Sequence, residues 1–186
     1  MDGRVNTQTV VLRRAKTSAN TNRMASKVEI QAIVRSAFDG VTLDGGVSFE
    51  RTRVLDNYGD VSSKEFNAMP QNEIIDDWAS IDVSTLDEFE TIAHLDSKGF
   101  RYYIPALMLR LLDNYDSGSM MTIATLHSLY PKEPSRELRY SQLNESQLRT
   151  IAEYMKALPA LVDLNGENQM IVERAYRNYW SKYLDT

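Results

Sequence analysis

The chain has 186 residues, and it contains no cysteine and only two histidines, His94 and His127. Without cysteine there can be no disulfide, no thiolate metal ligand and no catalytic thiol. Protein zinc sites usually combine several histidine or cysteine ligands, so two histidines argue against a zinc centre. We therefore expect no metal and no other cofactor, and we assign no catalytic residue.

The sequence also lacks long apolar runs and phosphate-binding glycine patterns. No run approaches the roughly 18 apolar residues that a membrane helix needs, and no stretch resembles the apolar core of a secretory signal. Gly45 and Gly46 adjoin each other, but neither the G-x-x-x-x-G-K nor the G-x-G-x-x-G spacing occurs. These absences predict a soluble, cytoplasmic protein that has no membrane segment and no nucleotide-binding loop.

Charge is present but unevenly distributed along the chain. The net charge is −5, yet residues 1–27 hold six basic residues against the single acid Asp2, so the remainder carries −10. An acidic surface repels phosphate, which argues against nucleic-acid binding by the body of the protein. Weak, salt-sensitive binding of nucleic acid through the basic N-terminal segment remains a less favoured alternative.

The first 25 residues are rich in Thr, Ser and Asn and have few apolar side chains besides Val10, Val11 and Leu12. This composition is typical of a disordered tail. The alternatives are an extension upstream of a start at Met24 and, less favoured, an organelle transit segment. We therefore divide the chain into a disordered basic tail or extension at 1–25 and a single globular domain at 26–186.

Apolar residues at helical spacing predict that this domain is mainly α-helical. Ser26 and Glu29 match a capping box, and an apolar stripe follows them as far as Phe38. The last predicted helix has a broad aromatic face, which we expect to pack on the core rather than to remain exposed as a partner site. The other helices are predicted at about 48–59, 85–95, 120–129, 144–159 and 168–184.

The stretch GFRYYIPALMLRLLD combines two patterns. Phe100, Tyr102 and Ile104 alternate with Arg101 and Tyr103, which predicts a short strand that begins after a helix ending at Lys98-Gly99.

The remainder of this stretch predicts a helix. Pro105 suits the first helical position, and the residues after it are apolar on nearly all sides, as in a buried helix. The expected fold class is thus mainly α, a compact multi-helix single domain with at most a small two-stranded β element. If GFRYYI pairs with the segment 40–43, α+β is the alternative.

Within this stretch, a functional interpretation remains open only for Arg101, Tyr103 and the nearby Asp96. The planar guanidinium group of arginine binds carboxylate or phosphate, and aromatic rings can stack beside it. We take Asp96, Arg101 and Tyr103 as candidate binding residues for an anion. The structural alternative, which we favour, is an ion pair of Arg101 with a carboxylate such as Asp96 or Asp77.

The same stretch resembles a mostly bacterial family known only as a domain of unknown function. The resemblance rests on an aspartate, a glycine-phenylalanine-arginine run with aromatics, and a proline-alanine-x-methionine helix start. In this chain the matching positions are Asp96, Gly99, Phe100, Arg101, Tyr103, Pro105, Ala106 and Met108. In layout the resemblance extends over about residues 28–183, and it implies no activity, cofactor or catalytic residue.

These observations favour a small interaction or regulatory protein without enzymatic activity. Toxin-neutralising immunity proteins are one such class, being small, acidic, single-domain and poor in cysteine, and their acidity steers them toward basic partners. A small-ligand-binding protein or an enzyme with an anion site around Arg101 is the first alternative, and nucleic-acid binding through the tail is the second. The sequence indicates a possible protein partner but neither its identity nor the oligomeric state.

Overall fold

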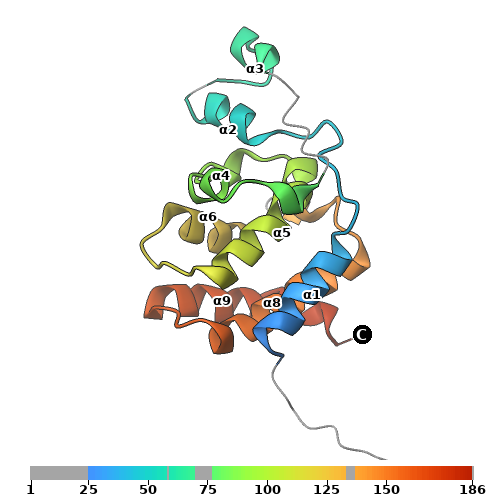
Figure 1. Ribbon diagram of the computed structural model, residues 1–186, viewed down its shortest axis with the longest axis vertical. Coiled ribbons are helices and arrows are strands. Elements are labelled where there is room, and N and C mark those ends of the chain that lie inside the picture. The colour runs from blue at the N-terminus through green and yellow to red at the C-terminus, as the bar shows by residue number, and fades with distance from the viewer. Residues whose placement is uncertain (1–24, 58, 70–76, 133–136, 186) are drawn as a thin grey trace, which may run out of the picture.

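The computed structural model describes residues 25–57, 59–69, 77–132 and 137–185 (Figure 1). Within these ranges the chain forms helices and no strand, so the mainly α prediction is confirmed there. The α-helices are α1 (Lys27–Ala37), α2 (Phe49–Asp56), α3 (Lys64–Ala68), α4 (Val83–Asp87), α5 (Ser97–Asp113), α6 (Met120–Ser128), α8 (Glu145–Leu161) and α9 (Gly166–Asn178). The 3-10 helices are η1 (Trp78–Ser80), η2 (Ile92–His94), η3 (Leu138–Tyr140) and η4 (Trp180–Tyr183).

Most α-helices begin after a residue whose side chain accepts a hydrogen bond from the first-turn backbone. The predicted capping box is present, since the Glu29 N–H donates to the Ser26 hydroxyl and the Ser26 N–H donates to the Glu29 carboxylate. Asn144 and Gln147 form a second capping box at the start of α8. Simple caps of the same kind are formed by Ser48, Ser63, Asp82, Asp96 and Asn165. Each such cap stabilises its helix by about 1 kcal/mol.

The strand predicted over Phe100–Ile104 is wrong, because this segment belongs to α5. This helix lies at the centre of the fold, where α1, α4, α6, η1 and η3 pack around it. The strand prediction assumed that Arg101 and Tyr103 face away from the core. Tyr103 is only 3% exposed, however, and nearly all the side chains of α5 are buried. A central helix that is apolar on every side carries no periodic signal that separates it from a strand.

The prediction that Pro105 is the first helical residue is wrong, because Pro105 lies inside α5. The helix begins after its N-cap Asp96, so Lys98-Gly99 forms the first turn of α5 and does not end a preceding helix. Because proline has no N–H group, the carbonyl of Arg101 lacks its usual intrahelical donor. Asp96, which accepts the Gly99 N–H, was the local sequence signal of the true start.

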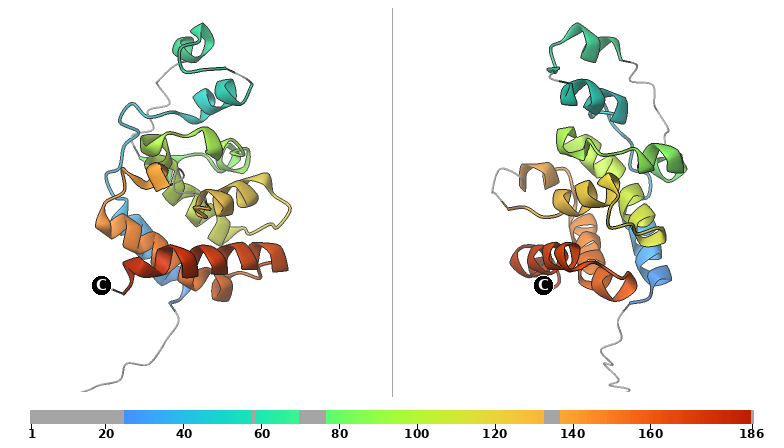
Figure 2. Two further views of the ribbon diagram at one scale, coloured as in Figure 1. Left: turned by 180° about the vertical axis from the view of Figure 1, so that it is seen from behind. Right: turned by 90° about the vertical axis from the view of Figure 1, so that its left-hand side faces the viewer.

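The helices are stacked from one end of the molecule to the other. Both ribbon views show α1, α8 and α9 at one end and α2 and α3 at the other, with α4, α5 and α6 between them (Figures 1 and 2). Buried side chains from both ends belong to one continuous apolar cluster. Tyr154 of α8 crosses this core, where its hydroxyl donates to the Met108 carbonyl and complete burial raises the pKa of the phenol.

Both tryptophans close the end of a helix by donating to a backbone carbonyl. The indole N–H of Trp78 donates to Phe38 at the end of α1, and that of Trp180 donates to Leu129 at the end of α6, each at 2.7 Å. Trp180 is fully buried against the rings of Tyr140 and Tyr179. The prediction that the C-terminal aromatic face packs on the core is therefore confirmed.

Several predicted helix boundaries differ from those of the structure. The helix expected at 85–95 is divided into α4 and η2, α8 continues through Pro159 to Leu161, and the last helix ends at Asn178 before η4. The predicted tail lies outside the described residues except for Ala25, and the division of the chain into tail and single domain stays a prediction. In the described ranges no helix is both long enough and apolar enough to cross a membrane.

Candidate functional site

The motif at the start of α5 holds the loop that leads into α2. One oxygen of the Asp96 carboxylate accepts the backbone N–H of Val47 at 3.0 Å and that of Gly99 at 2.8 Å. Seven residues further on, the Tyr103 hydroxyl accepts the backbone N–H of Phe49 at 3.0 Å. Asp96 and Tyr103, two of the predicted site residues, therefore accept hydrogen bonds from the loop segment 47–49.

Gly99 allows the backbone of this loop to lie directly against α5. A Cβ atom at position 99 would lie 2.4 Å from the Val47 carbonyl oxygen, and one at Gly46 would lie 2.6 Å from the Gly99 nitrogen. No heavy atom can be accommodated at such distances, so a side chain at either position would force the loop away from the helix. Gly99, one of the positions that carry the family resemblance, thus has a packing role.

Tyr103 belongs to an aromatic cluster beneath this loop. Its ring lies 4.9 Å from that of Phe89, which in turn lies 4.6 Å from that of Phe49, and both pairs meet edge to face. Such pairs contribute about 0.5–1.5 kcal/mol beyond the area that they bury. The Tyr103 side chain therefore supports the core and is not presented to solvent.

Arg101 lies elsewhere on α5. Residues two apart on a helix point about 200° apart, so Arg101 and Tyr103 do not share the face that strand geometry predicted. The expected ion pair with Asp96 or Asp77 is absent from the described residues, in which Asp96 and Asp77 act as helix caps. The Nε atom of Arg101 is buried without a hydrogen-bond partner. The anion-site hypothesis stays a prediction, reduced to the neighbourhood of this one side chain.

A second feature, which the sequence interpretation missed, is a cavity of about 290 Å³ next to α4. Acidic side chains dominate its polar lining, and Met120, which is 56% exposed, contributes an apolar edge. We call this cavity the acidic pocket. Its lining residues are Phe49, Arg53, Asp87, Glu88, Glu90, Thr91 and Met120.

The charges of the acidic pocket are only partly compensated. The guanidinium group of Arg110 donates two hydrogen bonds to Asp87, at 2.7 and 2.8 Å, and these bonds hold the pKa of that carboxyl below its usual range. Glu88 and Glu90 are exposed. Arg53, the basic residue of the lining, lies over the Phe49 ring at 5.9 Å from its centroid. The pocket thus presents more negative than positive charge.

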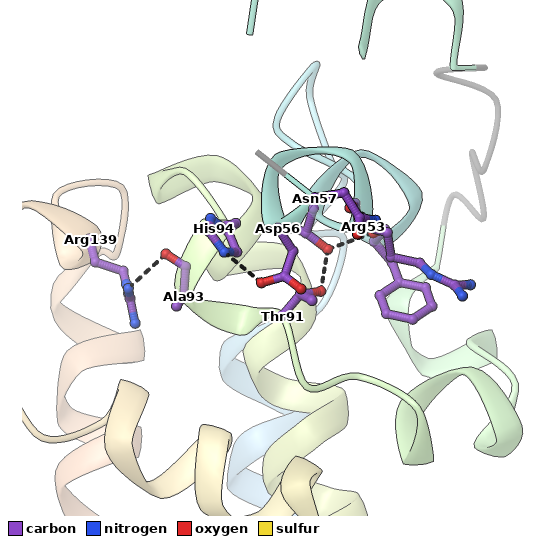
Figure 3. Close-up of polar contacts among 9 residues, drawn as sticks. Arg53, Asp56, Asn57, Thr91, Ala93, His94 and Arg139 are labelled. Atoms are coloured by element: carbon purple, nitrogen blue, oxygen red, sulfur yellow. Dashed lines mark hydrogen bonds and ion pairs between the residues drawn. The ribbon is translucent and has the colours of Figure 1, made fainter. Parts of the chain in front are cut away.

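A network of polar contacts fixes the backbone beside the acidic pocket (Figure 3). The His94 ring Nε2 lies 3.1 Å from the Asp56 carboxylate, which joins η2 to α2. Arg139 donates to the Ala93 carbonyl at 3.3 Å, and Thr91 shares a hydrogen bond with Thr52 in the buried layer. Figure 3 shows Arg53 extending away from the His94–Asp56 pair. His94 therefore links η2 to α2.

The sequence does indicate the negative charge of the acidic pocket. Between Lys64 and Lys98 there is no lysine or arginine, whereas Glu65, Glu73, Asp76, Asp77, Asp82, Asp87, Glu88, Glu90 and Asp96 are acidic. Such a segment repels itself unless it is solvated or meets positive charge. Among the described residues, no cluster of His, Asp and Glu side chains has the arrangement of a metal site.

The described residues thus form an all-helical arrangement with an acidic pocket next to α4. The chain belongs to a family of unknown function, DUF6714, whose model matches residues 26–184. The resemblance of the segment from Asp96 to Met108 predicted such a family, and this prediction is confirmed. No curated protein and no solved structure matches the chain.

Proposed function

We propose that this protein is a non-catalytic interaction protein that binds a basic protein partner at the acidic pocket. The observation that carries the proposal is the convergence of Asp87, Glu88 and Glu90 on one cavity with the exposed apolar side chain of Met120. A negative surface with an apolar edge suits a partner that presents lysine or arginine around an apolar anchor. The net charge of −10 outside residues 1–27 would accelerate the encounter.

An immunity-type role, in which a small acidic protein neutralises a basic toxin, is the form of this function that we favour. Binding alone is sufficient for such a role, and the pocket needs no nucleophile, general base or cofactor to perform it. The cysteine-free composition suits a reducing compartment, and we propose that the protein acts in the cytoplasm.

The proposal predicts that neutralising Glu88 and Glu90 weakens partner binding. In the double variant Glu88→Gln/Glu90→Gln we expect about 10-fold lower affinity, because two exposed charge contacts of about 0.5–1 kcal/mol each are lost. The measurement is quantitative capture of partners from the native host at low and high salt. Lower affinity with reduced salt dependence supports the proposal.

The matched control is Asp163→Asn/Glu167→Gln, which makes the same change in net charge at exposed positions outside the lining of the acidic pocket. This control should bind like the wild type. Equal loss of binding in the two double variants would show that only the overall charge matters. Full binding by the Glu88→Gln/Glu90→Gln variant would contradict the proposal outright.

A small-ligand site at Arg101, in a binding protein or an enzyme, is the second candidate, and the unpartnered Nε atom favours it. A buried guanidinium N–H without an acceptor costs about 1–3 kcal/mol, which an anionic ligand could offset. Weak nucleic-acid binding through the basic tail also stays a prediction, and residues 1–24 lie outside the described residues.

The Arg101→Met variant separates the ligand site from a structural role. For a ligand site, we expect the melting temperature of the free protein to change little, while the thermal shift caused by carboxylates or phosphates in a metabolite panel disappears. For a structural role, the melting temperature falls and the wild type shows no ligand-induced shift. Lys98→Met, one turn earlier on α5, is the control for loss of a positive charge.

A further inference from the structure

A groove between α1 and α8 lies apart from both the acidic pocket and Arg101. It encloses about 340 Å³, and its apolar wall consists of Ala25, Ile30 and Ile33 of the α1 segment. Ile33 is 37% exposed, and nearby Val28 is 73% exposed. A covering segment would remove the exposed part of Ile33 from water.

The polar rim of the groove is predominantly negative. Glu29 of α1 and Glu153 of α8 line it from opposite sides. Arg149 is the one basic side chain among these lining residues, so the two carboxylates leave the rim with a net negative charge. A segment that fits the groove should therefore combine an apolar centre with positive charge beside it.

The N-terminal segment of this same chain has that composition. Val10, Val11 and Leu12 form its apolar run, and Arg13 and Arg14 follow immediately. Residues 1–24 contain five basic residues and one acid. We propose that the segment Val10–Arg14 binds in the groove between α1 and α8 of its own chain, with its apolar side chains against Ile33 and its arginines beside Glu29 and Glu153.

Chain connectivity supports this occupant over a separate partner. Ala25, the first described residue, lines the groove, so residue 24 is joined to the chain at the site itself. Twelve residues separate Leu12 from Ala25, and an extended chain of that length reaches about 40 Å. The 11 residues of α1 span only about 16 Å, so the segment can double back along the helix. Tethering also supplies an effective concentration of about millimolar, at which weak apolar contacts suffice.

Paramagnetic broadening in the full chain tests the proposal directly. Because the protein has no cysteine, Thr9→Cys provides a single attachment point for a nitroxide label. We expect strong broadening of the Ile33 methyl signals. The methyl signals of Val61, which is 62% exposed near α3 at the other end of the molecule, should keep their intensity.

Two variants of the labelled chain show whether the apolar run is responsible. Val11→Ser/Leu12→Ser should restore the Ile33 signals, whereas Val5→Ser, which removes an apolar residue elsewhere in the segment, should leave them broadened. Equal broadening of Ile33 and Val61, or broadening that survives the double substitution, overturns the proposal. Broadening of Ile33 in an unlabelled chain mixed with a labelled one would assign the groove to a second copy and would also overturn it.

Discussion

Replacing Gly99 by alanine is expected to lower the free energy of unfolding by about 2–3 kcal/mol, the upper part of the range for overpacking. The new methyl group would lie 2.4 Å from the Val47 carbonyl oxygen, and its neighbour there is backbone, which cannot rotate away. The loop must then retreat from α5. That movement also weakens the hydrogen bonds from Val47 to Asp96 and from Phe49 to Tyr103. Urea denaturation followed by circular dichroism measures the change.

Gly166→Ala is the matched control for this substitution. Gly166 is the first residue of α9, and a Cβ atom added there would meet no heavy atom within 4 Å. Alanine has the higher helix propensity, so this variant should be as stable as the wild type or slightly more stable. If Gly99→Ala unfolds at the same urea concentration as Gly166→Ala, the close approach of the loop to α5 is wrong.

Replacing Trp180 by alanine is expected to cost about 3–5 kcal/mol, the range for removing a large buried aromatic residue. The indole is fully buried, packs on Tyr140 and Tyr179, and donates the hydrogen bond that satisfies the Leu129 carbonyl. Its loss leaves a cavity where η4, α6 and η3 meet. Because native domains are stable by only about 5–15 kcal/mol, this single change removes a large share of the total.

Two further variants divide the effect of Trp180. Trp180→Phe keeps most of the apolar volume but leaves the Leu129 carbonyl without its donor, so we expect a loss of about 1–3 kcal/mol. Met170→Ala on α9 truncates a side chain that is 44% exposed, and it should change stability by less than about 0.5 kcal/mol. Similar denaturation midpoints for Trp180→Ala and Met170→Ala would refute the burial of the indole.

Three of the positions that carry the family resemblance hold the loop before α2 against α5. Asp96, Gly99 and Tyr103 lie at positions i, i+3 and i+7 of one helix and contact the segment 46–49 in turn. Of the candidate binding residues, only Arg101 has no such role in the described residues. A functional search should therefore concentrate on Arg101 and on the acidic pocket rather than on all the positions that carry the resemblance.

The amino-acid sequence by itself determined the local features of this protein. The two capping boxes, at Ser26 and Asn144, join residues three apart, so their patterns are readable without any knowledge of the fold. The amphipathic stripes of α1 and α8 are equally local. The aromatic face of the last helix could be predicted to be buried because it is too large to leave in water.

Only the tertiary structure decided the nature of the segment Phe100–Ile104 and the position of the acidic pocket. All side chains of the segment except that of Arg101 are buried, and a segment buried on nearly every side shows no period that separates a helix from a strand. Val47 and Asp96 are 49 residues apart, and Phe49 and Tyr103 are 54 apart. The clearance at Gly99 and the convergence of Asp87, Glu88 and Glu90 with Met120 depend on such long-range contacts, which form only when the chain closes around α5.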